Sequence, residues 1–491
     1  RARFLILGGA FGLLAVFAQG FAIGIGGWTA PWLEALFGPL DDRQFGIGLG
    51  GVCAVLGFLF SLTTGLAYRG LFRGDRFVAG LVGLLVLAIL VFTAWPVTTM
   101  LAQMFTPREE LGVAQALAAR SLDARIWGLA CVTSRSGCGV FWNTLALACC
   151  TATAATSLGL AFALIVTRSR FPAKRAIRLL TVLPIITPPF VIGLGLILIF
   201  GRSGVVNQAV EAVTGVALGR WIYGFDGVLL AQVFSFTPTA FLVLIGVVEG
   251  ISPAMEEASE TLRASAMRTF RAVTLPLMRP GLANAWLVVF VESLADFGNP
   301  IVLGGSYGVL STEIFFAVVG AQQDFGRAAV LACVMLVIAL AAFLAQRAVV
   351  GRRSYVSVTG KGDVGLPTPL PPLVRRLAYG IGLPWAALTI TVYAMALAGG
   401  FVRVWGRDWT FTLSHFQRAF SFEWTADGRL LFSGSAWSSL FTTIELAAIA
   451  APITASLGLL AAWVLSRHRF RGRTALEFAL MLTFAVLALA A

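Results

Sequence analysis

Two acidic side chains lie inside an apolar stretch of this sequence and could interact with a charged solute. Glu292 and Asp296 stand four residues apart in VVFVESLADFGNP, so a helix would present both carboxylates on one face. An ionisable group at membrane depth is a functional candidate by default, and this pair would suit a cationic solute or a paired arginine. The alternative, slightly favoured, is that both lie near one end of a helix and join neighbouring helices by hydrogen bonds.

Further polar or helix-breaking residues extend this candidate pathway. Glu445 lies in a second apolar stretch, and its counterpart in a repeat described below is Ala146. Prolines at 184, 188 and 189 in TVLPIITPPFVIG are expected to break a span, and broken helices often line a pathway, although prolines also occur as simple kinks. The candidate pathway residues are therefore Glu292, Asp296, Asn299, Pro300, Pro188, Pro189 and Glu445.

Enzymatic chemistry is not indicated. The sequence contains no phosphate-binding loop of the form GxxxxGK(S/T), no nucleophile and base pair and no catalytic carboxylate pair. Its six cysteines and two histidines show no metal-ligand spacing, so neither a metal site nor a bound cofactor is expected. Cys131 and Cys138 fall in a predicted external segment, where a disulfide is conceivable but free thiols are favoured.

The elements that must position these residues are membrane-spanning helices. Of the 491 residues, 58% are hydrophobic and 12% are charged, whereas a soluble globular chain carries about 25% charged residues. The mean hydropathy is +0.88. Because a span needs about 20 apolar residues, we expect an all-α polytopic membrane protein with about eleven spans, near residues 4-27, 46-68, 77-102, 142-167, 179-200, 226-250, 282-304, 327-348, 378-400, 437-466 and 475-491.

The formal net charge of +13 does not indicate nucleic-acid binding. Most basic residues fall between the predicted spans, in clusters near residues 1–3, 69–76, 168–178, 263–279, 347–376 and 467–473. Cytoplasmic connections of membrane proteins collect lysine and arginine, so we place these clusters, and with them the N-terminus, on the cytoplasmic side. Strict alternation of eleven spans does not bring every cluster to one side, so some span boundaries are expected to be wrong.

An internal repeat divides the chain. TSLGLAFALIVTRSRF at 156–171 recurs as ASLGLLAAWVLSRHRF at 455–470, and the same register aligns NTLALA at 143–148 with TTIELA at 442–447. The expected parts are an N-terminal extension with two spans (1-76), a first unit (77-350), a cytoplasmic linker (351-376) and a second unit (377-491). The second unit lacks a counterpart of residues 252-280, so we expect a fragment of a longer protein or a degenerate second half.

The charged stretch EEASETLRASAMRTFRAVTLP, residues 256–276, predicts a helix, a turn and a second helix. Ser252 and Pro253 are typical of a helix start, and the acidic residues precede the basic ones, which is the order that a helix dipole favours. Ser265 could cap the second helix. Pro276 is expected to end the helical run because it lacks an N–H group.

One face of this stretch is apolar. Ala258, Leu262, Ala266 and Phe270 recur every four residues. Such a stripe suits either the membrane surface or a groove in a partner protein. The glutamates at 256, 257 and 260 would be repelled by anionic head groups, so the partner protein is favoured.

The same stretch resembles the EAA loop of ABC importer permeases. Glu257-Ala258-Ser259 corresponds to the E-A-A triplet of that loop, and residues 273–276 correspond to its I-x-L-P ending. The family's glycine falls on Arg263, where a left-handed backbone conformation would strain an arginine. The resemblance covers the chain from about residue 77, and DFGNP, VLSTEIFFAVVGAQ and RRSYVSVTGKGD are similar to the ferric-iron type of fused double permease.

The resemblance implies a tandem duplicated permease of the type I ABC importer fold in the inner membrane of a bacterium. It implies cytoplasmic ATPase subunits, expected as a dimer, that use ATP and Mg²⁺, and a periplasmic solute-binding protein. In the family, the loop forms a coupling helix that docks on the ATPase. The resemblance therefore assigns a coupling loop at 252-280, with the residues Glu256, Glu257, Ala258, Ser259, Leu262, Arg263, Ala264, Ser265, Phe270, Leu275 and Pro276.

The transported solute is less specifically indicated. The resemblance favours ferric iron, and related members of the family transport aminoethylphosphonate, thiamine, sulfate or polyamines. The alternative from another class is a secondary transporter or channel that is driven by an ion gradient, for which Glu292, Asp296 and Glu445 would be the ion sites.

Overall fold

The structure is a computed structural model that describes residues 1–24, 26–40, 46–107, 112–133, 138–216, 219–350, 369–424, 430–468, 470, 472–477 and 479–480. Within these residues, ten helical segments are long and apolar enough to cross a membrane: Ala2–Ala22, Leu49–Tyr68, Arg76–Phe105, Val140–Arg168, Pro189–Thr214, Phe225–Glu249, Ala266–Ala295, Phe325–Ala345, Pro372–Gly399 and Ser435–Arg467. The prediction of an all-α polytopic chain is confirmed. Most of the expected span at 475-491 and of the linker at 351-376 lies outside the described residues.

The chain divides into two compact units, of which the first combines Arg1–Thr98 with Ser438–Phe484. Its elements are α1 (Ala2–Ala22), β1 (Ile23–Gly24), β2 (Gly27–Trp28), α2 (Pro31–Phe37), α3 (Leu49–Tyr68), η1 (Leu71–Gly74), α4 (Arg76–Ile89), the π-helix η2 (Leu90–Ala94), the start of α5 (Trp95–Ala102) and most of α22 (Ser435–Arg467). Glycine permits the close packing of α1 on α3, because a Cβ on Gly9 would lie 2.6 Å from the backbone of Leu62. The described end of α22, Arg467, is the repeat counterpart of Arg168.

Within the described residues, the second unit comprises Thr99–Trp437. Its first half contains η3 (Gln103–Phe105), α6 (Val113–Ser121), α7 (Ala124–Trp127), α8 (Ala130–Thr133), α9 (Val140–Arg168), α10 (Lys174–Ile186), α11 (Pro189–Phe200), α12 (Val205–Thr214) and α13 (Phe225–Glu249). Its second half contains α14 (Pro253–Thr261), α15 (Ala266–Thr269), the π-helix η4 (Phe270–Thr274), α16 (Leu275–Ala295), α17 (Gly298–Leu303), α18 (Leu310–Val319), α19 (Phe325–Val350), α20 (Pro372–Gly399), β3 (Val402–Val404), β4 (Asp408–Phe411), α21 (Ser414–Ala419), β5 (Glu423–Trp424) and β6 (Leu430–Leu431). Among the described residues, the strands pair antiparallel in twos, β1 with β2, β3 with β4 and β5 with β6.

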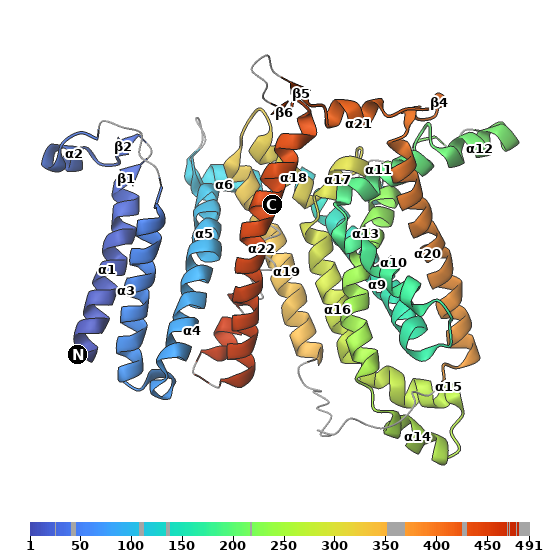
Figure 1. The fold of residues 1–491 in the computed structure, drawn as a ribbon, viewed down its shortest axis with the longest axis horizontal. Coiled ribbons are helices and arrows are strands. Elements are labelled where there is room, and N and C mark those ends of the chain that lie inside the picture. Colours follow the sequence, from blue (N-terminus) through green and yellow to red (C-terminus); the bar gives the residue numbers. More distant parts are fainter. Residues whose placement is uncertain are drawn as a thin grey trace. The chain divides into compact units, whose positions relative to one another are not determined.

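Helices α9 and α13 form the centre of the second unit, with α16 packed against both (Figure 1). Gly159 of α9 allows the closest approach, because a Cβ there would lie 2.9 Å from the backbone nitrogen of Phe241 on α13. Phe234 and Phe241 are fully buried. Figure 1 shows α14 and α15 at one end of this unit, and α12, α17 and α18 at the opposite end. The packed helices thus hold the charged segment 252–275 at one end of the unit.

The proline cluster breaks the span expected at 179-200. α10 ends at Ile186 and α11 begins at Pro189, with Pro188 in an extended conformation before it. The expected break is therefore confirmed at Pro188 and Pro189. Pro184 instead lies inside α10 without ending it.

Cys131 and Cys138 form a disulfide, so the prediction of free thiols is wrong. Cys131 lies in α8 and Cys138 lies two residues before α9, and their Cα atoms are 4.8 Å apart, which is within the range that a disulfide requires. Sequence spacing alone does not determine this approach, because it depends on how the two helices meet.

Candidate functional site

The charged segment folds as α14, a turn and α15, as predicted. Ser252 occupies the N-cap position of α14 and Pro253 its first turn, although the Ser252 side chain makes no capping bond. Ser265 caps α15 by accepting a hydrogen bond from the Arg268 backbone N–H at 3.4 Å. The residue preferences at helix starts therefore predict where α14 and α15 begin.

The two adjacent glutamates of α14 differ in their exposure to solvent. Glu256 is 1% exposed, whereas Glu257 is exposed. Because residues one position apart on a helix are separated by about 100°, only one of them can face the spans. Glu256 faces inward, and Glu257 remains on the open surface.

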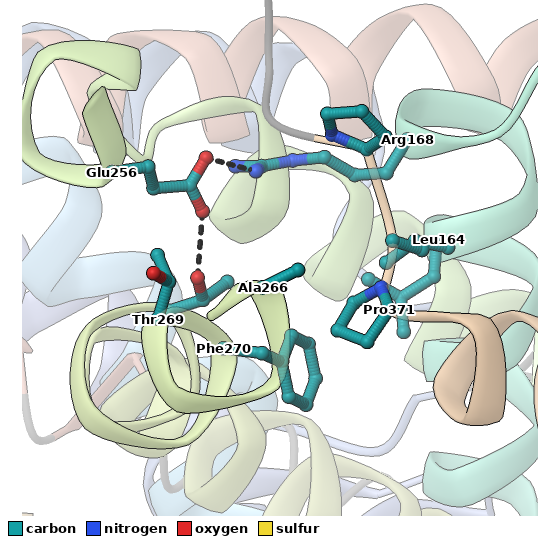
Figure 2. A pocket seen from close by; sticks show the side chains of 10 residues that line it. Leu164, Arg168, Glu256, Ala266, Thr269, Phe270 and Pro371 are labelled. Atoms are coloured by element: carbon teal, nitrogen blue, oxygen red, sulfur yellow. Dashed lines mark hydrogen bonds and ion pairs between the residues drawn. The ribbon is translucent and has the colours of Figure 1, made fainter. Parts of the chain in front are cut away.

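Glu256 forms a buried ion pair with Arg168, the last residue of α9 (Figure 2). The Thr274 hydroxyl donates a hydrogen bond to the second carboxylate oxygen, Oε1, at 2.6 Å. Nη2 of Arg168 also donates to the backbone carbonyl of Val248, near the end of α13, at 3.4 Å. One carboxylate therefore joins α14 to α9 and to the start of α16.

Arg168 and Thr274 were not identified as site residues from the sequence. Arg168 was recognised only as a member of a basic cluster. A signal was nevertheless present, because an arginine closes the apolar run in both copies of the repeat, at 168 and at 467. Thr274 carried no comparable signal.

The turn after α14 places Arg263 in the left-handed region, with φ of +59°. Two backbone hydrogen bonds define the turn: Ala264 N–H to Ser259 O at 3.2 Å, and Arg263 N–H to Glu260 O at 2.8 Å. This pattern is a Schellman motif, in which glycine is the preferred residue at the left-handed position. The expected strain at Arg263 is therefore present, and the motif explains why the family has glycine there.

We predict that Arg263→Gly stabilises the protein, because glycine adopts positive φ without the Cβ penalty. The expected gain in the free energy of unfolding is about 1 kcal/mol. The measurement is thermal unfolding in detergent. Arg268→Gly, at an exposed helical position in α15, serves as the control and should destabilise. A lower unfolding temperature for Arg263→Gly would contradict the strain.

The prediction that Pro276 ends the helical run is wrong. Residues Phe270–Thr274 form a π-helical turn, and α16 continues from Leu275 through Pro276. The wider turn accommodates the missing N–H and the bulk of the proline ring. The same arrangement occurs at Leu90–Ala94, two residues before Pro96.

The apolar stripe of this segment is mostly open. Leu262 is 84% exposed, Ala258 and Ala266 are exposed, and Phe270 is half-buried. Met255 adds a further apolar side chain that is 51% exposed. α14 therefore presents Met255, Glu257, Ala258, Glu260 and Leu262 as an unpartnered surface within the described part of the chain, which we call the α14 outer face.

Asp296 lies in a buried hydrogen-bond network between α13, α16 and α17. Gln232, which is 0% exposed, donates to Oδ2 of Asp296 at 3.0 Å, and Asn299 Nδ2 donates to the same oxygen at 2.8 Å. Gln232 Oε1 accepts from the Thr151 and Ser293 hydroxyls at 2.8 and 2.6 Å. These bonds join α9, α13 and α16. Such hydrogen bonding between helices is the role that we gave above as the alternative to solute contact.

Four of the pathway candidates lie together. A Cβ built on Gly298 would lie 3.3 Å from Pro189 Cβ and 3.6 Å from Asp296 Oδ1, and Asn299 and Pro300 follow Gly298 in α17. Pro300 is buried in α17. Glu292 contacts Thr239 of α13, and its Oε2 atom is buried without a partner among the described residues. Glu445 is exposed on α22.

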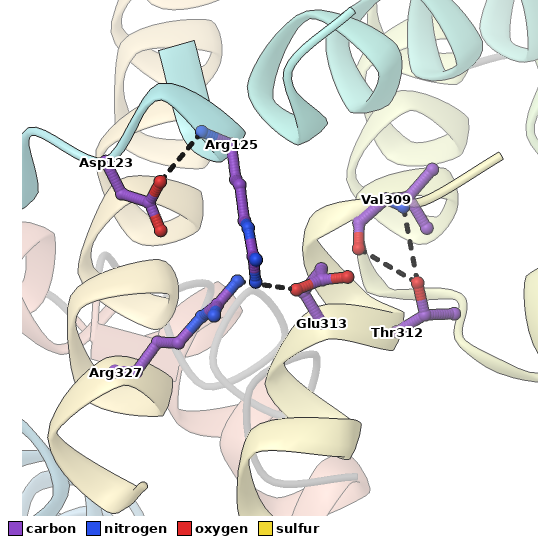
Figure 3. A network of polar contacts seen from close by, with 6 residues as sticks. All are labelled: Asp123, Arg125, Val309, Thr312, Glu313 and Arg327. Carbon is purple, nitrogen blue, oxygen red and sulfur yellow. Dashed lines mark hydrogen bonds and ion pairs between the residues drawn. The ribbon is translucent and has the colours of Figure 1, made fainter. Parts of the chain in front are cut away.

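A second polar cluster, which sequence analysis missed, lies at the opposite end of the unit from α14. Arg327 of α19 pairs with Glu313 of α18 at 2.8 Å, and Arg125 of α7 extends toward this pair (Figure 3). Arg120, 9% exposed, pairs with Asp324 at 3.4 Å. These side chains come from α6, α7, α18 and the start of α19, which only the tertiary fold brings together, so sequence spacing carried no signal.

Comparison with known proteins places these features in a family. Residues 155–355 match the family model described as binding-protein-dependent transport system inner membrane component. The chain is 36% identical over 456 residues to the putative ferric transport system permease protein FbpB 1 of Haemophilus influenzae, covering 92% of this chain and 69% of that protein. The chain belongs to the family of binding-protein-dependent transport system inner membrane components.

Other members of the family show how far the similarity extends. The ferric transport system permease protein FbpB of Actinobacillus pleuropneumoniae is 37% identical over 454 residues, covering 92% of this chain and 63% of that protein. The chain thus spans about two thirds of the length of both ferric permeases. The molybdenum transport system permease protein ModB of Mycobacterium tuberculosis is 31% identical over 191 residues, covering 39% of this chain and 70% of that protein.

Family membership makes this chain a multi-pass inner-membrane permease of an ABC importer, and thus a transporter rather than an enzyme. The matched range contains Arg168, Glu256 and Thr274, together with the whole of α14. The buried ion pair and the α14 outer face therefore lie in the part of the chain that the family shares.

Proposed function

We propose that this permease couples solute movement to cytoplasmic ATPase subunits through the segment 252–280, with the α14 outer face as the docking surface. The observation that carries this proposal is the division of α14 into two faces. Glu256 is anchored in the unit, whereas Glu257, Ala258 and Leu262 are open. A short helix with an open face of mixed charge and apolar residues suits a groove in a partner protein.

The partner subunits supply the ATP chemistry. The sequence has no phosphate-binding loop, so ATP and Mg²⁺ are assigned to the ATPase dimer. A periplasmic binding protein delivers the solute, in keeping with the description of the family as binding-protein-dependent. The side of the membrane at which α14 lies is assigned as cytoplasmic from its basic cluster, and the N-terminus is assigned to the same side.

Ferric iron is the proposed solute. Two relatives that each align with 92% of this chain are named as ferric transport permeases. Relatives named for molybdenum align with a shorter part of the chain. Residues 77-350 and 377-491 are proposed as the two permease units, 351-376 as their linker and 1-76 as an N-terminal extension.

The proposed function is tested by isolating the protein from its native membrane. We expect an ATPase subunit to co-purify with the permease, and uptake of radioactive ferric iron to stop when ATP is depleted. Dissipation of the ion gradient alone, with ATP maintained, should leave uptake unchanged. A permease that carries no ATPase and still transports after ATP depletion would be a secondary transporter, and the proposal would be wrong.

A further inference from the structure

We propose that Arg168 is a positioning residue that fixes the coupling segment to the end of α9, so that α14 and the spans move together. This inference rests on the proposed docking of the ATPase at the α14 outer face. It adds that the force transmitted from the ATPase passes through the Arg168–Glu256 pair.

The pair is buried and fully engaged at its carboxylate. The side chains of Arg168 and Glu256 are 4% and 1% exposed. Glu256 accepts from both Arg168 and Thr274, and Arg168 also reaches the Val248 carbonyl. These contacts tie α14 to α9, α13 and the start of α16, which are the helices at the centre of the unit.

The end of the linker covers the pair. Pro369, Leu370 and Pro371, which precede α20, line the small cavity beside Arg168 and Glu256 (Figure 2). The cavity holds about 10 Å³, which is space for about one water molecule. Leu370 is 8% exposed. Because so little water reaches the pair, separating the two charges is costly, and the link between α14 and α9 is stiff.

A second ion pair at the same end of the unit lacks these properties. Arg178 of α10 and Glu249 of α13 lie 3.5 Å apart, but their side chains are 54% and 56% exposed. Exposed pairs contribute little, because water screens them. Arg178 therefore provides a matched control for Arg168.

Directional bonds, rather than burial alone, are what the proposed role requires. Apolar side chains of similar volume can replace a buried ion pair without loss of stability. Apolar side chains at 168 and 256 would fill the same space, but they could not form the bonds to Thr274 and Val248. The orientation of α14 would therefore no longer be fixed. A comparison of the two kinds of variant separates positioning from packing.

The test uses the assembled complex of permease, ATPase and binding protein in proteoliposomes, with radioactive ferric iron as the probe. Arg168→Met should retain the ATPase, because the α14 outer face is unchanged, but iron moved per ATP hydrolysed should fall at least tenfold. Arg178→Met should leave this ratio unchanged. The double variant, Arg168→Met with Glu256→Leu, replaces both charges by apolar side chains. It leaves no unpaired buried charge, so it can be measured even if the single variant unfolds.

The outcomes separate this inference from the proposed function. A fallen ratio in the double variant, with ATPase still bound and the thermal unfolding temperature unchanged, supports positioning by Arg168. A ratio restored to that of the unmodified complex in the double variant shows that the pair only fills space, and overturns the inference while ATPase docking stands. Failure of the unmodified permease to bind any ATPase overturns both.

Discussion

Replacing Glu257 by arginine and Ala258 by glutamate is expected to abolish ATPase binding while the spans remain folded. Both residues are exposed on α14 and contact no core cluster, whereas Glu256 behind them stays anchored to Arg168. Reversing the charge and inserting a second charge at the centre of a docking surface typically costs about 3 kcal/mol, or roughly a hundredfold in Kd. The measurement is ATPase recovered with the tagged permease, together with ATP-dependent transport.

The chain offers a matched control for this double substitution. Glu211 and Ala212 repeat the same dipeptide on α12, where both residues are also exposed, at the opposite end of the unit (Figure 1). Glu211→Arg with Ala212→Glu should therefore leave ATPase binding unchanged. Equal ATPase recovery from both double variants would mean that the α14 outer face is not the docking surface.

Gln232→Leu is expected to cause the largest loss of stability outside the coupling segment. Gln232 is 0% exposed and bonds to Thr151, Ser293 and Asp296, so leucine would leave polar groups on α9, α16 and the start of α17 without this partner. Interhelical hydrogen bonds in membranes contribute about 0.6 to 1.7 kcal/mol each, so the free energy of unfolding should fall by about 3 kcal/mol.

The control for this substitution is Gln322→Leu, because Gln322 is an exposed glutamine in the same unit. It should change the free energy of unfolding by less than about 0.5 kcal/mol. The measurement is unfolding by denaturing detergent, followed by the loss of helical signal. If Gln232→Leu is as stable as the control, the network around Asp296 is not a structural link, and substrate contact becomes the better interpretation of these polar residues.

The coupling segment shows which rules are local. Its two helices, the cap at Ser265 and the strained position at Arg263 follow from short-range preferences, and the sequence predicts each of them. Pro276 was interpreted with an equally local rule, yet the helix continues. A π-helical turn accommodates the proline, and Thr274 in this turn is buried against the unit.

Glu256 and Glu257 show what local sequence preferences do not predict. Glu256 and Glu257 are chemically identical and adjacent, and the resemblance to the EAA loop gave more weight to Glu257. Packing of α14 against α15 and η4 accompanies the inward position of Glu256, which bonds to Arg168 and Thr274, while Glu257 stays on the surface. Nothing in the helical period alone decides which of two neighbours faces the core, because the rotation of a short helix is set by what it packs on.

By itself, the sequence determined the membrane class, most spans, the broken helix at Pro188 and Pro189, and the relationship to ABC permeases. Hydropathy and short motifs are properties of segments of about 20 residues, so they can be recognised without knowing how the helices pack. Tertiary structure decided the partners of Glu256 and Asp296 and the pairing of Cys131 with Cys138. The bonds from Arg168 to Glu256 and from Gln232 to Asp296 join residues 88 and 64 positions apart. Such contacts depend on the register and rotation of packed helices, which no local pattern specifies.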